Sequence, residues 1–182
     1  MAKKQLKTVK EVLFWSYANL AMAHSAVERK QEKYNPFNYM IRAKLFKGLI
    51  GGSMSIGTLF DDEKIKLEVG YKCNYCGSIE NLALDHILPK KLGGKDTGDN
   101  LIYACKSCNS SKGKKDMMEW MSDKNMFPSL MILRRYLKLV IAYCIENNLM
   151  DCSVIEIEKQ NHIFKIEYTP RSYPKPNKLK LI

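Results

Sequence analysis

Helical spacing of apolar residues dominates the first fifty or so positions of the chain. A capping box formed by Thr8 and Glu11 opens one predicted helix, which we expect to run to about Lys33. Pro36 stands at the first position of a second predicted helix, which ends near Lys47, before a group of glycines. The N-terminal part of the chain is therefore expected to be helical.

The middle of the chain switches to short apolar runs separated by turn residues. Residues 48–58 are expected to form a flexible joint, and residues 64–72 alternate as a short strand does. Residues 84–88 and 100–104 are apolar runs on either side of a turn-rich segment, which predicts a β-hairpin with a long loop. A helix is expected from Ser110 onward.

The C-terminal part begins with a predicted buried helix, because residues 130–145 are apolar nearly all round. Residues 154–158 and 162–168 alternate between apolar and polar positions, which predicts a second β-hairpin. The tail, residues 170–182, is rich in Pro and Lys and is expected to be irregular. These patterns predict an α+β fold in three parts: an N-terminal helical region (1–63), a central unit (64–122) and a C-terminal region (123–182).

Composition narrows the class of partner. Hydrophobic residues make up 46% of the 182 residues, which is typical of a folded globular protein. Lys and Arg number 30 against 19 Asp and Glu, and the resulting net charge of +11 favours a nucleic acid over a membrane surface. No apolar run is long enough to cross a bilayer and no export signal is apparent, so we expect a cytoplasmic protein whose thiols stay reduced.

Four of the six cysteines form two Cys-x-x-Cys pairs, Cys73 with Cys76 and Cys105 with Cys108. Each pair can present two thiolates as a knuckle, and two knuckles complete the tetrahedral coordination of Zn²⁺. Four thiolates leave no position open for water, so we expect a structural Zn²⁺ that stabilises a unit too small to fold on its core alone. Unligated thiols are the alternative. Zinc ribbons and other nucleic-acid-binding modules share this spacing, so the cysteines alone do not name a function.

An Asp85-His86 pair lies between the two cysteine pairs and adds hydrolytic chemistry. His86 can accept a proton from water near neutral pH, while Asp85 and the amide oxygen of Asn109 can bind a hard cation such as Mg²⁺. Neighbouring residues of a strand point to opposite faces, so both side chains serve one site only where the strand ends or twists. Taken singly, each residue has an ordinary structural explanation as a turn cap, a half-buried His or a helix cap. Taken together, they predict cleavage of a phosphodiester.

The segment 73–112 resembles the core of the HNH endonucleases, which belong to the ββα-metal group of nucleases. The residues that carry the resemblance, in chain order, are Asp85, His86, Pro89, Gly93, Gly94, Asn100, Leu101, Cys105, Cys108, Asn109 and Lys112. Asn109 stands where the last His that names the family would be, a variant that favours a Mg²⁺ site made of oxygens. The resemblance implies a ββα-metal core stapled by the four-cysteine zinc site. The predicted N-terminal helices flank this core on one side, and the C-terminal helix and β-hairpin flank it on the other.

The resemblance also implies a role for individual residues. His86 would be the general base that deprotonates water, and Asp85 and Asn109 would bind the catalytic Mg²⁺, with Mn²⁺ as a substitute. Asn100 would hold the loop between the strands and so orient His86. Lys112 would lie close to a backbone phosphate.

Basic residues in and after this segment are candidates for contact with double-stranded DNA. They are Lys112, Lys114, Lys115, Arg134 and Arg135. A chain of this size resembles small HNH enzymes of restriction or phage-defence systems, and a type II restriction-like enzyme would leave 5′-phosphate and 3′-hydroxyl ends as a homodimer. The alternatives are a nicking or nonspecific nuclease of a mobile element, and an inactive zinc-stapled DNA-binding module. The joint presence of Asp85, His86 and Asn109 argues against the inactive module.

Overall fold

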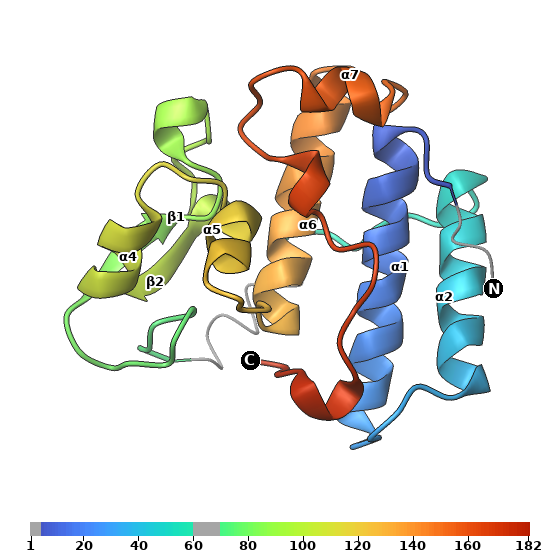
Figure 1. Cartoon of the computed structure of the whole chain (residues 1–182), viewed down its shortest axis with the longest axis horizontal. Helices are drawn as coiled ribbons and strands as arrows, with labels where there is room; N and C mark the ends of the chain where they lie inside the picture. The colour runs from blue at the N-terminus through green and yellow to red at the C-terminus, as the bar shows by residue number, and fades with distance from the viewer. Residues whose placement is uncertain (1–4, 60–69) are drawn as a thin grey trace.

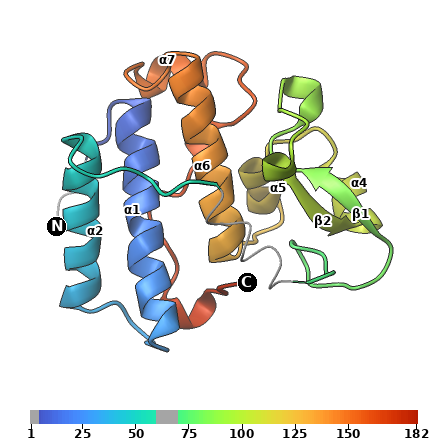
Figure 2. The same ribbon diagram turned by 180° about the vertical axis from the view of Figure 1, so that it is seen from behind.

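The helices and strands of the chain form two groups that lie side by side (Figure 1). The structure is a computed structural model that describes residues 5–59 and 70–182. The elements in chain order are α1 (Val9–Glu28), α2 (Pro36–Ile50), β1 (Leu82–His86), the 3₁₀ helices η1 (Lys90–Leu92) and η2 (Gly98–Asn100), β2 (Leu101–Cys105), α4 (Lys106–Lys112), α5 (Met117–Asp123), α6 (Leu130–Glu146), α7 (Val154–Glu158), and the 3₁₀ helices η3 (Ile166–Tyr168) and η4 (Pro176–Lys178). Figures 1 and 2 show α1, α2 and α6 on one side and β1, β2 and α4 on the other, with α5 between the two groups.

The two N-terminal helices form as predicted. The Thr8 hydroxyl accepts a hydrogen bond from the Glu11 N–H at 3.2 Å, and the Glu11 carboxylate accepts one from the Thr8 N–H, which completes the capping box of α1. The helix ends before Lys33, because Lys30 adopts a φ of 52° and an α-helix cannot continue through that left-handed conformation. Pro36 occupies the first position of α2, as expected.

The predicted β-hairpin of the central unit is confirmed. β1 pairs antiparallel with β2, with Leu82 opposite Cys105 and His86 opposite Leu101. Residues 64–69 of the other predicted strand lie outside the described residues, and residues 70–72 are irregular.

The helix that follows β2 differs from the prediction in two ways. It begins at Lys106, before the expected Ser110, and it stops at Lys112. Gly113 takes a φ of 54°, which breaks the helix, and Asp116 then caps a second short helix, α5. Two short helices therefore replace the single predicted one.

The long helix α6 forms where the apolar run predicted it and lies at the centre of the core. Leu133 and Leu137 of α6 are fully buried and belong to the same cluster as Ile87, next to β1, and Trp120 of α5. The ββα unit and the helices therefore share one core, which fixes the position of the unit on α6. Among residues 5–59 and 70–182, no helix combines the length and the apolar character needed to cross a bilayer.

The predicted C-terminal β-hairpin is wrong. Residues 154–158 form the short helix α7, and residues 166–168 form η3. Ser153 and Glu156 form a capping box, which satisfies the first N–H groups of a helix. Burial follows the helical spacing, because Val154 and Ile157 are buried while Ile155 is 65% exposed.

The C-terminal tail is ordered by contacts with the helices. The first two N–H groups of α6, those of Leu130 and Met131, donate to the backbone oxygens of Lys180 and Leu181. The indole N–H of Trp15 in α1 donates to the Arg171 oxygen at 2.9 Å. The tail therefore supplies acceptors for N–H groups that a helix N-terminus leaves without partners.

Candidate active site and metal centre

The four paired cysteines meet at one end of the β-hairpin. Cys73 and Cys76 precede β1, Cys105 ends β2, and Cys108 lies in α4. Their Sγ atoms all lie within 4.8 Å of one another, and those of Cys76 and Cys105 are 3.7 Å apart. Tetrahedral zinc with Zn–S distances of about 2.3 Å needs sulfur pairs roughly 3.8 Å apart, so the cluster fits a structural Zn²⁺. The predicted four-cysteine cluster is confirmed.

Backbone contacts hold the first cysteine pair in the shape of a knuckle. The Cys73 N–H donates to the Ser78 oxygen at 2.7 Å, and the Gly77 N–H donates to the Cys73 oxygen at 2.8 Å. Burial disfavours the Cys73 thiolate, but backbone N–H groups, that of Cys105 foremost, outweigh burial and lower the pKa of the thiol to about 7. A readily ionised thiol suits metal binding, because the thiolate is the form that ligates.

Asp85, near the end of β1, lies in the interior with both carboxylate oxygens in contact with other side chains. The Tyr75 hydroxyl donates to Oδ2 at 2.8 Å, and the Lys112 ammonium lies 3.2 Å from Oδ1. The same ammonium donates to the backbone oxygen of His86 at 2.7 Å. Lys112 therefore links the two residues that the sequence singled out for chemistry.

The position of Lys112 corrects the prediction that it contacts a DNA phosphate. The side chain is 1% exposed, and α4 directs it toward β1 and the buried Asp85. Burial lowers the pKa of Lys112, and the charge of Asp85 opposes that shift. A buried carboxylate without a cation is costly, so the ion pair accounts for the inward position of the lysine. Lys114 and Lys115 are exposed, and Lys115 pairs with Asp123 at 2.5 Å.

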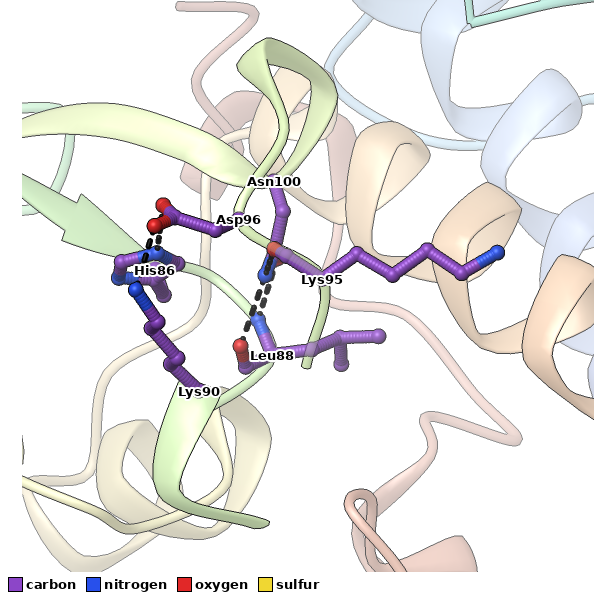
Figure 3. A network of polar contacts seen from close by, with 6 residues as sticks. All are labelled: His86, Leu88, Lys90, Lys95, Asp96 and Asn100. Carbon is purple, nitrogen blue, oxygen red and sulfur yellow. Dashed lines mark hydrogen bonds and ion pairs between the residues drawn. The ribbon is translucent and has the colours of Figure 1, made fainter. Parts of the chain in front are cut away.

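Asn100 lies at the end of η2 and ties the long loop of the hairpin to the end of β1 (Figure 3). Its side-chain oxygen accepts from the Leu88 N–H at 2.8 Å, and its amide nitrogen donates to the Leu88 oxygen at 2.9 Å and to the Lys95 oxygen at 2.8 Å. The side chain is 1% exposed. These contacts fix the backbone two residues after His86 and also the backbone of the loop.

His86, the last residue of β1, contacts a side chain that the sequence did not single out. Its Nε2 atom lies 2.9 Å from Oδ1 of Asp96, and the Lys90 ammonium contacts Oδ2 of the same carboxylate (Figure 3). Hydrogen bonds from Lys90 and then from His86 hold the pKa of Asp96 below its usual range. The sequence signal that could have pointed to Asp96 was a charged residue within the loop that Asn100 ties to the end of β1.

Asp85 on β1 and Asn109 on α4, the two predicted ligands of a catalytic ion, both carry oxygen donors. Asn109 precedes Lys112 by three residues on α4, and positions three apart share a helix face. Asn109 therefore lies on the face of α4 from which Lys112 reaches Asp85. A carboxylate and an amide oxygen suit Mg²⁺ or Mn²⁺, and the buried Asp85 already holds one cation, that of Lys112. The residues therefore fit a divalent ion, provided that it replaces the Lys112 ammonium.

The two arginines predicted to contact DNA lie on α6, where the structure gives Arg135 another role. Its guanidinium is 5% exposed and donates to the backbone oxygens of Gly98 at 2.8 Å and Asp99, just before Asn100. The structure thus uses the Arg135 guanidinium to hold the long loop of the hairpin, and a phosphate contact at Arg135 stays a prediction. Lys138 of α6 is also buried and donates to the Thr58 oxygen. Arg134 is half-buried.

These features define a class of protein domain. In it a two-stranded hairpin and a helix are joined by a four-cysteine metal site, and an Asp-His pair lies at the end of a strand. Residues 73–115 match the family model of the HNH endonucleases, so this segment is an HNH endonuclease domain. The chain is similar to the CRISPR-associated endonuclease Cas9 of Corynebacterium diphtheriae, with 32% identity over 87 residues. That similarity covers 43% of this chain and 8% of the Cas9 protein. No solved structure matches the chain.

Proposed function

We propose that this chain is a metal-dependent DNA endonuclease. The observation that carries the proposal is the arrangement at the end of β1 within an HNH domain. There the His86 imidazole is held by a carboxylate, and the neighbouring Asp85 is a buried carboxylate that already binds a cation. A base and a cation site next to each other are what hydrolysis of a phosphodiester needs.

Each residue has a definite task in this reaction. His86 accepts a proton from the attacking water, which leaves a hydroxide to attack phosphorus. Asp85 and Asn109 would hold a divalent ion, Mg²⁺ or Mn²⁺, which would supply positive charge to stabilise the reacting phosphate. Asn100 keeps the loop and the strand end together, so that His86 stays in place. The products are 5′-phosphate and 3′-hydroxyl ends.

Cleavage at specific sites, as by a type II restriction-like enzyme of a phage-defence system, is the finer part of the proposal. The similarity to a protein named a CRISPR-associated endonuclease supports nuclease chemistry. Because the chain spans 8% of that protein, the activity of the whole relative does not transfer. A zinc site needs reduced thiols, which supports a reducing compartment such as the cytoplasm.

The surface of the N-terminal region best suited to DNA is the outer face of α2. Residues 33–60 contain no Asp or Glu, and Lys44 and Lys47 of α2 are exposed. Phe37 and Tyr39 are also exposed and can pack against sugar or base. Figures 1 and 2 show α2 and the ββα unit on opposite sides of α1, so α2 would hold DNA at a distance from the bond that is cut. A homodimer through the same face competes with this assignment, and sedimentation of the protein with and without DNA separates the two.

The test is cleavage of a large unmethylated linear DNA by the full chain with Mg²⁺, beside an EDTA control. His86→Ala is expected to abolish cutting while zinc content and DNA binding stay unchanged. His162→Ala is the matched control, because His162 contacts Gln160 and the Tyr143 ring and has no role in the proposed reaction. Discrete bands that vanish with His86→Ala and with EDTA support a site-specific endonuclease.

Other outcomes of the same experiment reject the proposal in whole or in part. A smear or nicked circles would contradict the restriction-like specificity and favour a nonspecific or nicking enzyme. Intact DNA that is shifted on a gel would contradict endonuclease activity and favour a binding module.

A further inference from the structure

The contact between His86 and Asp96 determines which ring nitrogen of His86 carries the proton. An ionised carboxylate can only accept hydrogen bonds, so the Nε2 atom, 2.9 Å from Asp96 Oδ1, must be the donor. The Lys90 ammonium on the other oxygen keeps the carboxylate in its ionised form. In a neutral imidazole with its proton on Nε2, the Nδ1 atom is the proton acceptor.

The backbone that carries Asp96 is anchored on both sides, although the side chain itself is 52% exposed. The residue before it, Lys95, accepts a hydrogen bond from Asn100 at its backbone oxygen and pairs with Glu146 of α6 at 2.7 Å. Two residues after it, the Gly98 oxygen accepts from the buried Arg135. These contacts place the carboxylate of Asp96 at a defined position relative to His86.

We propose that Asp96 is a positioning residue for the general base: it holds the imidazole of His86 with the proton on Nε2 and leaves Nδ1 free to accept a proton from the attacking water. The role of His86 as the base rests on the proposed function, whereas the hydrogen bond and the tautomer do not depend on it. Lys90 assists by occupying the second oxygen of Asp96, which limits rotation of the carboxylate.

Stability of the fold does not account for this arrangement. An ion pair between exposed groups such as Lys90 and Asp96 adds little to stability, because solvent screens the charges and the side chains lose entropy. An alanine at position 96 should therefore leave the thermal midpoint unchanged while it releases the His86 ring.

The test uses the full zinc-bound chain labelled with ¹⁵N, and records long-range ¹H–¹⁵N spectra of the histidine rings at a pH where the rings are neutral. His86→Gln assigns the His86 signals among those of the three histidines. The wild type is expected to show a protonated Nε2 and an unprotonated Nδ1. Asp96→Ala should move both nitrogens toward the averaged values of a free imidazole, and Asp96→Asn should retain the wild-type pattern, because the amide oxygen still accepts from Nε2.

Cleavage kinetics of the same variants give the second readout. Asp96→Ala is expected to lower kcat by about 10- to 100-fold with an unchanged KM, because the base is misplaced while DNA binding is intact. Asp96→Asn should recover most of that loss. Asp99→Ala is the matched control, since Asp99 lies on the same loop and its side chain lies 3.9 Å from Arg135, away from the His86–Asp96 contact.

Two results would overturn the inference: ring signals that do not change in Asp96→Ala, or changed signals with kcat unaffected. A wild-type protein that does not cut DNA would refute the proposed function. In that case the ring spectra alone decide whether Asp96 positions His86, so the two failures are distinguishable.

Discussion

The ammonium of Lys112 lies 3.2 Å from the carboxylate of Asp85, and neither side chain is more than 7% exposed. Removing either partner of such a buried ion pair is destabilising, because the remaining charge is then buried without an opposite charge beside it. In the absence of a divalent ion, Lys112 therefore supplies the positive charge that the buried Asp85 requires. A divalent ion bound at Asp85, as proposed above, would therefore compete with the Lys112 ammonium for this carboxylate.

Lys112→Met should therefore lower the stability of the metal-free protein and raise its affinity for Mg²⁺. The variant leaves Asp85 without a cation, so we expect the metal-free protein to lose about 3 kcal/mol of unfolding free energy. Mg²⁺ should bind the variant more tightly than the wild type and restore part of this loss, as measured by calorimetric titration and by denaturation with and without Mg²⁺. Lys114→Met, an exposed neighbour, should behave as the wild type in both measurements. Equal stabilisation of all three proteins by Mg²⁺ would reject the competition.

Loss of one zinc ligand should unfold the nuclease unit. Cys73→Ser removes a ligand from a site that joins the segment before β1 to the end of β2 and to α4, and we expect zinc content to fall from about one ion per chain to nearly none. The variant should also show a lower thermal midpoint and increased protease sensitivity within the HNH domain. Cys152→Ser is the control, because Cys152 lies outside the cluster and should retain zinc. Full zinc content in Cys73→Ser would exclude the four-cysteine site.

A buried carboxyl group outside the active site predicts a dependence of stability on pH. Burial raises the pKa of Asp116 from 3.8 to about 6, although the Tyr136 hydroxyl and two N–H groups of α5 oppose the shift. Between about pH 4 and pH 6 the folded protein holds a proton that the unfolded chain has released, so stability falls as the pH rises through this window. The loss should reach ~2 kcal/mol between pH 4 and pH 7.

Asp116→Asn isolates this contribution, because Asn also caps a helix and accepts from Tyr136. Denaturant unfolding of both proteins across the pH range gives the difference in their unfolding free energies. As the pH rises, the wild type should lose unfolding free energy relative to Asp116→Asn. A difference that does not vary with pH would show that Asp116 does not titrate in this window.

The inward position of Arg135 can be distinguished from a role in DNA contact by salt dependence. Arg135→Ala should destabilise the protein by about 2 kcal/mol, because it removes charged hydrogen bonds to two backbone oxygens of the active-site loop. The slope of log affinity against log salt should stay unchanged for DNA binding. Lys114→Ala, in contrast, should lower that slope by about one and leave stability unchanged. A reduced slope in Arg135→Ala would restore Arg135 as a phosphate contact.

Much of the fold follows from local patterns that the sequence states directly. The capping box at Thr8, the Pro at position 36 and the apolar run of α6 each determine a helix start through contacts within a few residues. The spacing of the four cysteines likewise predicts their cluster, because ligands of one ion must converge wherever the rest of the chain lies. One local signal was missed in the prediction: the capping box of Ser153 and Glu156 favours the helix α7 over the alternating pattern of a strand.

Tertiary structure decided which charged side chains point inward. Lys112 and Arg135 have the same local signature as exposed cations. In the fold they turn inward to partners from distant elements, Lys112 to Asp85 and Arg135 to the oxygens of Gly98 and Asp99. The sequence by itself determined the cysteine cluster, the β-hairpin and the starts of α1, α2 and α6, because ligand spacing, apolar patterns and capping residues are visible along the chain. The pairing of Asp96 with His86 arises only when Asn100 and Arg135 fold the loop back, since a contact between residues ten positions apart depends on the path of the chain between them.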